Sequence, residues 1–357
     1  MSTTKKIKVL YIFAGQRKKT EEAWRAGMMP DTYFIGMNHM HLFDIDAEYI
    51  ETSLINRLRR INFNLANIFL IFKMRQYDII FTGASIFFIF LAKVIFRFSK
   101  PKFVYYNTSL TNLYKRSNRG FKKWMVKKTI KSLDLIVCPS VAQKDFLIKQ
   151  GFDKNKICFI ANGVDVDFIS CHNDQKKPVE KFILSVGKDM GRDYKTLIEV
   201  VRNIDINVKI VAVPANIYDI KDIPSNVTIE TLPFMDLLDL YKNCEFVVIP
   251  TKKEDYLNAS DCSGQYVLLD SMASSRAVIV SKRETLKDYF VDGEDGIVVE
   301  SENPAELRAA IEKLINHPSL AKEMGNRAFM RVSDNFTTKK FAERLASAFK
   351  LIVDKKA

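Results

Sequence analysis

The stretch that decides the fold is SVGKDMGRDYKTL at residues 185–197. Apolar residues before Gly187 are typical of the end of a buried strand, glycine permits a close turn, and a helix is expected to begin near Asp193. Lys188 and Arg192 would then lie in the turn, beside the helix N-terminus. Because backbone N–H groups and the helix dipole attract anions there, the stretch predicts a diphosphate site. An ordinary turn with two solvated cations is the alternative.

Short apolar runs alternate with helical stretches on both sides of this unit, which predicts an α/β fold with parallel sheets and helices on both faces. The expected strands are Ile7–Phe13, Asp78–Phe81, Lys102–Tyr106, Asp134–Cys138, Ile157–Ile160, Phe182–Val186, Val208–Val213, Thr228–Leu232, Glu245–Ile249, Ala277–Val280 and Gly296–Val299. The expected helices lie near 52–75, 84–98, 118–131, 140–150, 193–203, 235–243, 264–275, 303–316, 319–333 and 338–355.

A polar stretch divides these elements into two sets. It contains HNDQKKP at residues 172–178. We therefore expect two Rossmann-like, doubly wound domains, at residues 1–169 and 181–337, with a linker at 170–180 between them. The carboxyl ends of their strands would face a common cleft, where such sheets bind ligands. The last helix, within 338–357, is expected to return to the first domain.

The net charge of +13 is carried by the first half of the chain. Residues 1–170 hold 28 Lys and Arg against 13 Asp and Glu, a net charge of +15, whereas residues 171–357 have a net charge of −2. Residues 79–133 contain twelve basic residues, twelve aromatic residues and no carboxylate. This distribution predicts an anionic partner for the first domain.

The basic residues crowd most densely around Trp124 and Phe121. The residues expected to meet a membrane or an acceptor are Lys115, Arg116, Arg119, Lys122, Lys123, Trp124, Lys127 and Lys128. A second candidate is the stretch 52–75, with Arg57, Arg59 and Arg60. Several basic residues together could hold a protein on an anionic leaflet, with the aromatic rings at the level of the headgroups. A solvated basic helix face with its aromatic rings packed inward is the alternative.

The cysteine and histidine content and the apolar runs restrict the cell compartment, the metal content and the membrane topology that are expected. Five scattered cysteines and four histidines indicate a reducing compartment and no structural metal. The apolar run at residues 7–13 is too short for a targeting segment and is interpreted as a strand. Residues 79–98 are long enough to span a bilayer, but Lys93 and Arg97 favour a buried strand followed by a packed helix.

A second cluster, DCSGQYVLLDSMA at residues 261–273, starts a mostly apolar helix. Free backbone N–H groups at Gly264 and Gln265 would face an anion. Asp270 is the only charge on this helix before Arg276, and a carboxylate on a buried helix needs a partner. Ribose hydroxyls and an internal Arg or Lys are the two candidate partners of this carboxylate, and the sequence does not choose between them.

Asp165 and Asp167 form an Asp-x-Asp pair after an Asn-Gly turn. Such a pair could hold a divalent metal with a nucleotide sugar. A role at a turn or a helix start is the commoner use of aspartate, and it is favoured here.

These motifs together resemble GT-B glycosyltransferases of family four, also described as glycosyl transferases group 1. The resemblance is carried by DLIVCPS at 134–140, Gly151, KICFIANGVD at 156–165, the loop from Ser185 to Arg192, the helix at 264–273 and DYFVDGEDGIVV at 288–299. It covers residues 134–350 well, whereas the first 130 residues match only in their alternation of strands and helices.

The resemblance implies a nucleotide-sugar donor site. Lys188 and Arg192 would bind the diphosphate and act in catalysis, and Asp270 would hold the ribose where the family usually has Glu. The residues implied to bind the donor are Gly15, Gly187, Lys188, Arg192, Ser263, Gly264, Gln265 and Asp270. The family's glycine-rich loop is reduced to Gly15 and its neighbours, and a family histidine is replaced near Asn107, the third catalytic candidate.

One departure from the family concerns the donor sugar. The family's other Glu, which meets that sugar, would fall at Cys262. Glu254 and Asp261 in the preceding loop are candidate substitutes.

The implied activity is transfer of a sugar to a glycan or lipid-linked acceptor in polysaccharide or glycoconjugate synthesis. It would be retaining and independent of metals and cofactors, because cations and helix N-termini would stabilise the leaving diphosphate. The expected location is the cytoplasm, peripheral on the inner face of the cell membrane. Alternatives are a non-catalytic homologue that binds a sugar nucleotide or a partner glycosyltransferase, a nucleotide-sugar epimerase, and a basic nucleic-acid-binding protein. No RNA or DNA motif supports the last.

Overall fold

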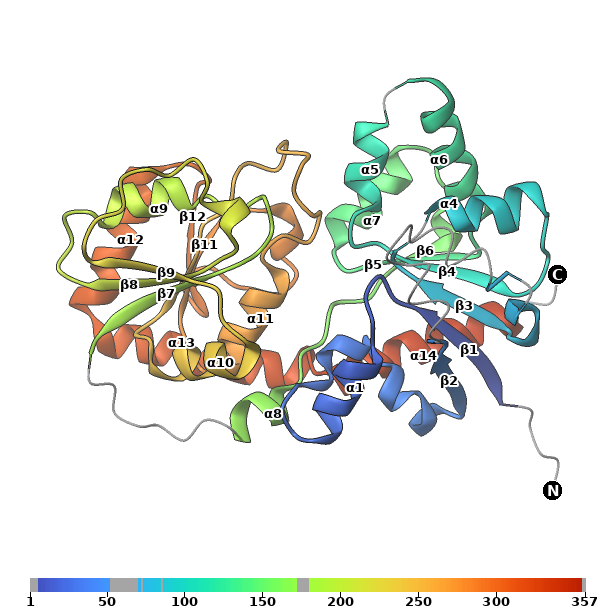
Figure 1. Cartoon of the computed structure of the whole chain (residues 1–357), viewed down its shortest axis with the longest axis horizontal. Helices are drawn as coiled ribbons and strands as arrows, with labels where there is room; N and C mark the ends of the chain where they lie inside the picture. Colours follow the sequence, from blue (N-terminus) through green and yellow to red (C-terminus); the bar gives the residue numbers. More distant parts are fainter. Residues whose placement is uncertain are drawn as a thin grey trace. The chain divides into compact units, whose positions relative to one another are not determined.

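Two six-stranded parallel sheets with flanking helices form the protein (Figure 1). The computed structural model describes residues 6–51, 70–71, 73–84, 86–117, 119–171 and 180–354. Unit 1 comprises residues 1–161 and 338–357, and unit 2 comprises residues 162–337. The predicted α/β class with two Rossmann-like sheets is confirmed.

Unit 1 contains a sheet in the order β2-β1-β3-β4-β5-β6. Its strands are β1 Ile7–Ile12, β2 Ile45–Tyr49, β3 Ile79–Thr82, β4 Lys102–Tyr106, β5 Leu135–Cys138 and β6 Ile157–Phe159. Its helices are α1 Lys18–Arg25, η1 Asp31–Phe34, η2 Met37–Phe43, η3 Lys73–Gln76, α4 Ile86–Ile89, the π-helical turn η4 Phe90–Ile95, α5 Leu110–Arg116, α6 Gly120–Ser132, α7 Val141–Lys149, η5 Lys154–Lys156 and α14 Thr338–Asp354.

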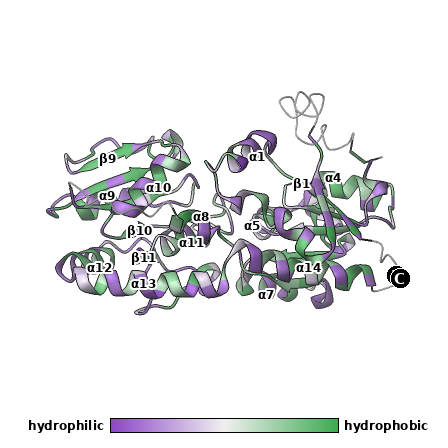
Figure 2. Cartoon of the chain, turned by 90° about the horizontal axis from the view of Figure 1, so that it is seen from below, coloured by the Kyte–Doolittle hydropathy of each residue, from purple (hydrophilic) through white to green (hydrophobic). Residues whose placement is uncertain are grey.

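Alternation along β1 shows how this sheet is buried on both faces. Leu10 and Ile12 pack in one apolar cluster with residues of α4, α6 and α7, whereas Val9 and Tyr11 pack in another with residues of α14. Successive side chains of a strand point to opposite faces, so both faces are covered. Figure 2 shows hydrophilic and hydrophobic residues alternating along α14, as expected for a helix that covers a sheet.

Unit 2 contains a sheet in the order β12-β11-β10-β7-β8-β9. Its strands are β7 Phe182–Val186, β8 Asn207–Val211, β9 Val227–Glu230, β10 Val247–Ile249, β11 Val278–Ser281 and β12 Gly296–Val299. Its helices are α8 Val166–Cys171, α9 Tyr194–Val201, η6 Pro214–Asn216, α10 Phe234–Asn243, α11 Gln265–Ala273, η7 Glu284–Leu286, α12 Pro304–Asn316 and α13 Pro318–Asn335. Strand order reverses between β7 and β10, and ligands of such sheets bind at that point, outside the carboxyl ends of the strands.

The boundary between the units lies after Ala161, so residues 162–169 belong to unit 2 rather than to the first domain as expected. Helix α8 contacts α11 of unit 2. Most of the predicted linker lies outside the described residues. The same is true of most of the predicted helix at 52–75, including Arg57, Arg59 and Arg60. The apolar stretch 79–98 forms β3, α4 and η4, and no helix in the described part of the chain has the length and apolarity to cross a membrane.

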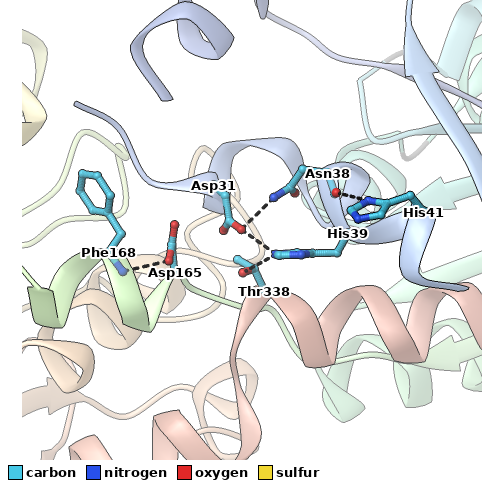
Figure 3. A network of polar contacts seen from close by, with 7 residues as sticks. All are labelled: Asp31, Asn38, His39, His41, Asp165, Phe168 and Thr338. Carbon is cyan, nitrogen blue, oxygen red and sulfur yellow. Dashed lines mark hydrogen bonds and ion pairs between the residues drawn. The ribbon is translucent and has the colours of Figure 1, made fainter. Parts of the chain in front are cut away.

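A buried carboxylate fixes the start of α14 in unit 1 (Figure 3). Asp31 Oδ2 lies 2.6 Å from His39 Nε2 and accepts a hydrogen bond of 2.8 Å from Asn38 Nδ2. His39 Nε2 also lies 3.3 Å from the hydroxyl of Thr338, the first residue of α14. Burial raises the pKa of Asp31, but hydrogen bonds from His39, Asn38 and Thr338 outweigh it and lower the pKa below its usual value.

We predict that Asp31→Asn lowers the stability of unit 1 by about 1–3 kcal/mol at pH 7, because it weakens charge-assisted hydrogen bonds in a buried site. A lowered pKa stabilises the fold above the unfolded pKa of about 3.9, and this stabilisation is lost as pH falls through the folded value. The difference between the variant and the wild type should therefore shrink below about pH 4. Thermal unfolding from pH 7 to 3.5 measures it. Exposed Asp46→Asn on β2 is the control, and an equal loss at every pH would contradict the assignment.

Candidate functional site

Gly187 and Arg192 build the site at the point where the strand order of unit 2 reverses. Gly187 follows β7 directly, and its N–H donates to the Val211 carbonyl at 3.0 Å. A Cβ on Gly187 would lie 1.9 Å from Nε of Arg192. A side chain at position 187 would therefore displace the guanidinium of Arg192, which occupies this space over the end of the strand.

The loop that carries Arg192 is held on both sides. Asp189 Oδ1 accepts from the N–H of Gly191 and Oδ2 from that of Ser260, both at 2.9 Å. Asp193 caps α9 by accepting from the N–H of Thr196 at 3.3 Å, and its own N–H donates to the Pro250 carbonyl at 3.1 Å. These contacts tie the loop to α9 and to the segment after β10, so Arg192 is positioned before any ligand arrives.

Arg192 is a buried cation without a counter-ion among the described residues. Its exposed fraction is 5%, and neither Nε nor Nη1 has a protein partner in the described part of the chain. Burying a charge without a partner is costly, so the site is suited to receiving an anion. Arg192 also lines a cavity of about 340 Å³ together with two lysines and four acidic residues, namely Lys195, Lys252, Asp193, Glu199, Asp219 and Glu302. Lys188 is exposed beside the same loop.

The N-terminus of α11 lies against Arg192. Gly264 caps this helix with φ of 95°, a conformation that favours glycine, and a Cβ on it would lie 3.3 Å from Nη1 of Arg192. Ser263 is 2% exposed, and its hydroxyl has no hydrogen-bond partner within the described ranges. Both residues thus lie where the sequence predicted an anion site.

The expectation of a free N–H at Gln265 is wrong. Its backbone N–H donates to the Cys262 carbonyl at 3.1 Å. Its side chain is fully buried, donates from Nε2 to the Thr285 carbonyl at 2.7 Å and accepts from Nδ2 of Asn162 at 2.8 Å. A local turn before the helix uses the backbone donor, so Gln265 joins three segments of unit 2 instead of facing a ligand.

Asp270 is placed on α11 without an internal cation. No described residue forms an ion pair or a hydrogen bond with its carboxylate, and Arg276 donates to the Lys242 carbonyl instead. Burial raises the pKa of Asp270 to about 7. Of the two partners that the sequence left open, the described residues supply no internal Arg or Lys, which favours a hydroxyl-bearing ligand.

The two unit 1 candidates are engaged in local structure. Asn107 is fully buried, and its Oδ1 accepts from the N–H of Leu110 at 2.9 Å while its Nδ2 donates to Thr111 at 3.1 Å. It therefore caps α5, and this placement argues against the predicted catalytic contact. Gly15 is exposed after β1, where the helix that follows is capped by Glu51, whose Oε2 accepts from the N–H of Arg17 at 2.7 Å.

The remaining acidic candidates are placed as follows. Asp165 Oδ1 accepts from the N–H of Phe168 at 3.0 Å at the start of α8 (Figure 3), and Asp167 is exposed. Glu254 Oε1 accepts from the N–H of Glu284 at 2.7 Å. Asp261 is buried and Cys262 is half-buried. No group of side chains in the described ranges has the composition of a metal site.

The predicted basic surface lies on α5, α6 and the turn between them. All of its basic residues are exposed: Lys115, Arg116, Arg119, Lys122, Lys123, Lys127 and Lys128. Trp124 is 46% and Phe121 is 69% exposed, and their ring centroids lie 5.4 Å apart. These aromatic rings do not pack fully inward, contrary to the alternative interpretation.

Sequence reasoning missed Arg283, Thr251 and Thr285. Arg283 follows β11 and is 5% exposed, and its Nη1 donates to the Lys252 carbonyl at 3.2 Å. The hydroxyls of Thr251 and Thr285 are buried without a partner within the described residues. A basic residue directly after an apolar strand was a usable signal for Arg283, whereas the threonines carried none.

Comparison with known proteins agrees with this geometry. The Glycosyltransferase Family 4 model matches residues 41–168, and the Glycosyl transferases group 1 model matches residues 182–317. Together with the two parallel sheets, these matches define a GT-B glycosyltransferase. The chain belongs to family four, the group 1 glycosyltransferases, and is a transferase.

Relatives and solved structures extend over most of the chain. An uncharacterised glycosyltransferase of Methanocaldococcus jannaschii is 25% identical over 87% of this chain and 83% of its own length. The N-acetylgalactosamine-N,N′-diacetylbacillosaminyl-diphospho-undecaprenol 4-alpha-N-acetylgalactosaminyltransferase of Campylobacter jejuni is 24% identical over 63% of each chain. Anabaena HepE, solved with UDP and glucose, is similar in fold, with a TM-score of 0.68, 14% identity and coverage of 97% of this chain and 100% of that one.

We predict that Asp270→Asn stabilises the ligand-free protein above pH 7. The pKa of about 7 is raised above the unfolded value, so the wild type loses stability as pH rises to that pKa, while the neutral amide does not. The gain in melting temperature should be largest at pH 8, shrink as the pH falls below 7, and vanish only below about pH 4, the pKa of the unfolded state. Differential scanning fluorimetry checks this, with exposed Asp205→Asn as the control. A destabilised variant at pH 8 would show that Asp270 has an internal partner.

Proposed function

We propose that this glycosyltransferase moves a sugar from a nucleotide-sugar donor to a glycan or lipid-linked acceptor at the cytoplasmic face of a membrane. The observation that carries the donor assignment is the buried guanidinium of Arg192, without a counter-ion in the described ranges and next to the N-terminus of α11. A diphosphate supplies the charge that this cation lacks. Asp270, further along α11, supplies acceptors for ribose hydroxyls. HepE, solved with UDP, supports a nucleotide donor.

The proposed reaction proceeds by stabilisation of the leaving group. As the bond between the sugar and the diphosphate opens, negative charge grows on the departing phosphate. Arg192 is a buried cation that would stabilise this charge, with the exposed Lys188 beside it, and a loop held by Asp189 and Asp193 needs little reorganisation. The proposed transfer retains the anomeric configuration and requires no metal or cofactor. Polysaccharide or glycoconjugate synthesis is the proposed role.

The proposed acceptor is anchored at an anionic membrane. Exposed apolar side chains on unit 1 include Ile95 and Phe96, which are 53% and 55% exposed, as well as Phe121 and Trp124 of the basic surface. Helix α6 contacts η4, and the Trp124 ring centroid lies 5.7 Å from that of Phe90 on η4. Aromatic residues surrounded by lysines suit the interface of a bilayer with anionic headgroups. The Campylobacter jejuni relative, named for a diphospho-undecaprenol substrate, supports a lipid-linked acceptor.

We predict that Arg192→Met lowers the rate of sugar transfer by about 100-fold or more, because removing one preorganised charge donor has effects of this size. Lys188→Met should lower the rate less, since Lys188 is exposed. Transfer from the donor found in a thermal-shift screen of nucleotide sugars is the measurement. Lys181→Met, an exposed lysine at the opposite end of β7, is the control. Unchanged rates in both site variants, with an unchanged melting temperature, would refute the donor site.

We predict that the protein sediments with vesicles containing phosphatidylglycerol, and that binding weakens with salt. Replacing Lys122, Lys123, Lys127 and Lys128 with Gln should weaken binding by roughly 700-fold, since each basic residue near an anionic surface contributes about 1 kcal/mol and a factor of ten corresponds to about 1.4 kcal/mol. The matched control replaces four exposed lysines of unit 2, namely Lys181, Lys221, Lys313 and Lys322. Equal binding to neutral phosphatidylcholine vesicles, or equal loss in the control, would contradict the membrane assignment.

A further inference from the structure

Arg283 is a second buried cation at the carboxyl ends of the strands in the unit 2 sheet. It follows β11, which pairs with β10, and β10 pairs with β7. Its Nη1 donates to the Lys252 carbonyl at 3.2 Å, just after β10. The ends of β7, β10 and β11 thus carry Arg192, Thr251 and Arg283 in spatial order.

The charge of Arg283 is not balanced by an ion pair within the described ranges. The side chain is 5% exposed, and its Nε has no protein partner among those residues. Burial lowers the pKa of Arg283. The negative charges of Glu254 and Asp189 act in the opposite direction but do not outweigh burial. Both carboxylates accept backbone hydrogen bonds, Asp189 from Gly191 and Ser260 and Glu254 from Glu284.

Buried hydroxyls surround the two arginines. Those of Thr251, Ser263 and Thr285 have no hydrogen-bond partner within the described residues. A Cβ on Gly191, next to Arg192, would lie 3.1 Å from the hydroxyl of Ser263, and the Thr285 carbonyl is held by Gln265 at the start of α11. Unpaired buried hydroxyls are costly, so this edge is suited to a ligand rich in hydroxyl groups as well as in charge.

A nucleotide diphosphate does not account for Arg283. Lys188 and Arg192 already provide two cations for the diphosphate of the proposed donor. Arg283 lines a separate cavity of about 340 Å³, with Ser281, Leu286 and Phe290, on the β11 side of the edge. Glu254, in the loop before α11, is the carboxylate that acts most strongly on Arg283, but its Oε1 accepts the N–H of Glu284 and it forms no ion pair with Arg283 within the described ranges. An anionic group on the donor beyond the diphosphate would supply the ion pair that Arg283 lacks.

We propose that Arg283 binds a carboxylate on the donor sugar, so that the donor is a nucleotide-activated uronic acid. The planar guanidinium matches a carboxylate with two parallel hydrogen bonds, and the buried hydroxyls of Thr285 and Ser263 suit the hydroxyl groups of a sugar ring. Arg283 is then a residue that determines donor specificity. This inference rests on the proposed nucleotide-sugar donor site.

Calorimetric titration with matched ligands tests the inference. The probes are UDP, UDP-glucose and UDP-glucuronate, with GDP, GDP-mannose and GDP-mannuronate as a second series, because the neutral and acidic sugars in each series differ at one carbon. The wild type should bind the uronate at least about tenfold more tightly than the neutral sugar in one series. Arg283→Met should remove this preference and change the affinity for the nucleoside diphosphate less than about threefold.

Two control variants separate the outcomes. Lys322→Met removes an exposed lysine of α13 that lines neither cavity, and it should leave every affinity unchanged. Arg192→Met should weaken all ligands of the series that binds, the nucleoside diphosphate included. Equal affinity for neutral and acidic sugars, or an equal loss of nucleoside diphosphate binding in Arg283→Met, would overturn the inference and leave the donor site standing. Failure of every nucleotide to bind would overturn the proposed function and this inference with it.

Discussion

The structure of unit 2 depends on one costly arrangement, the burial of the Arg192 guanidinium over the end of β7. Gly187 has no side chain because Arg192 fills that space, and Gly264 brings the start of α11 next to the same group. The carboxylates of Asp189 and Asp193 accept backbone hydrogen bonds that hold the loop and the helix, and they form no ion pair with the arginine within the described residues. The fold therefore keeps a positive charge available at the point where the strand order reverses.

The two positive regions of the protein differ in exposure. The lysines of α6 are solvated, so in the proposed function each contributes little alone and they act together on an extended anionic surface. Arg192 and Arg283 are nearly inaccessible, so each is suited to a specific anion rather than to a surface. The near-neutral second half of the sequence thus contains two buried cations, Arg192 and Arg283, that its net charge does not reveal.

Most strands could be predicted from the sequence because buried parallel strands are continuous apolar runs, as in β7 and β11. Strand β2 was missed because it is an edge strand, paired with β1, and its sequence IDAEY has one exposed face. Helix α1 was missed because it buries none of its residues. Local spacing predicted Lys188, Arg192 and Gly264 as donor-site residues, and this assignment stays a prediction. It did not predict the structural roles of Gln265 and Asn107, since their contacts with Asn162, Thr285 and Thr111 are set by the tertiary fold or by capping.

The site is a place where stability is given up for binding. Asp270 has a pKa of about 7 because burial opposes its ionisation, and Arg283 has a lowered pKa for the same reason, so opposite charges on one unit are both left without ion pairs in the described part of the chain. Pairing such groups with each other would stabilise the free protein and close the site. In the proposed function, a ligand supplies both an anion and hydroxyl groups at different positions. A nucleotide sugar has this distribution of groups, and its binding would restore the stability that the free site lacks.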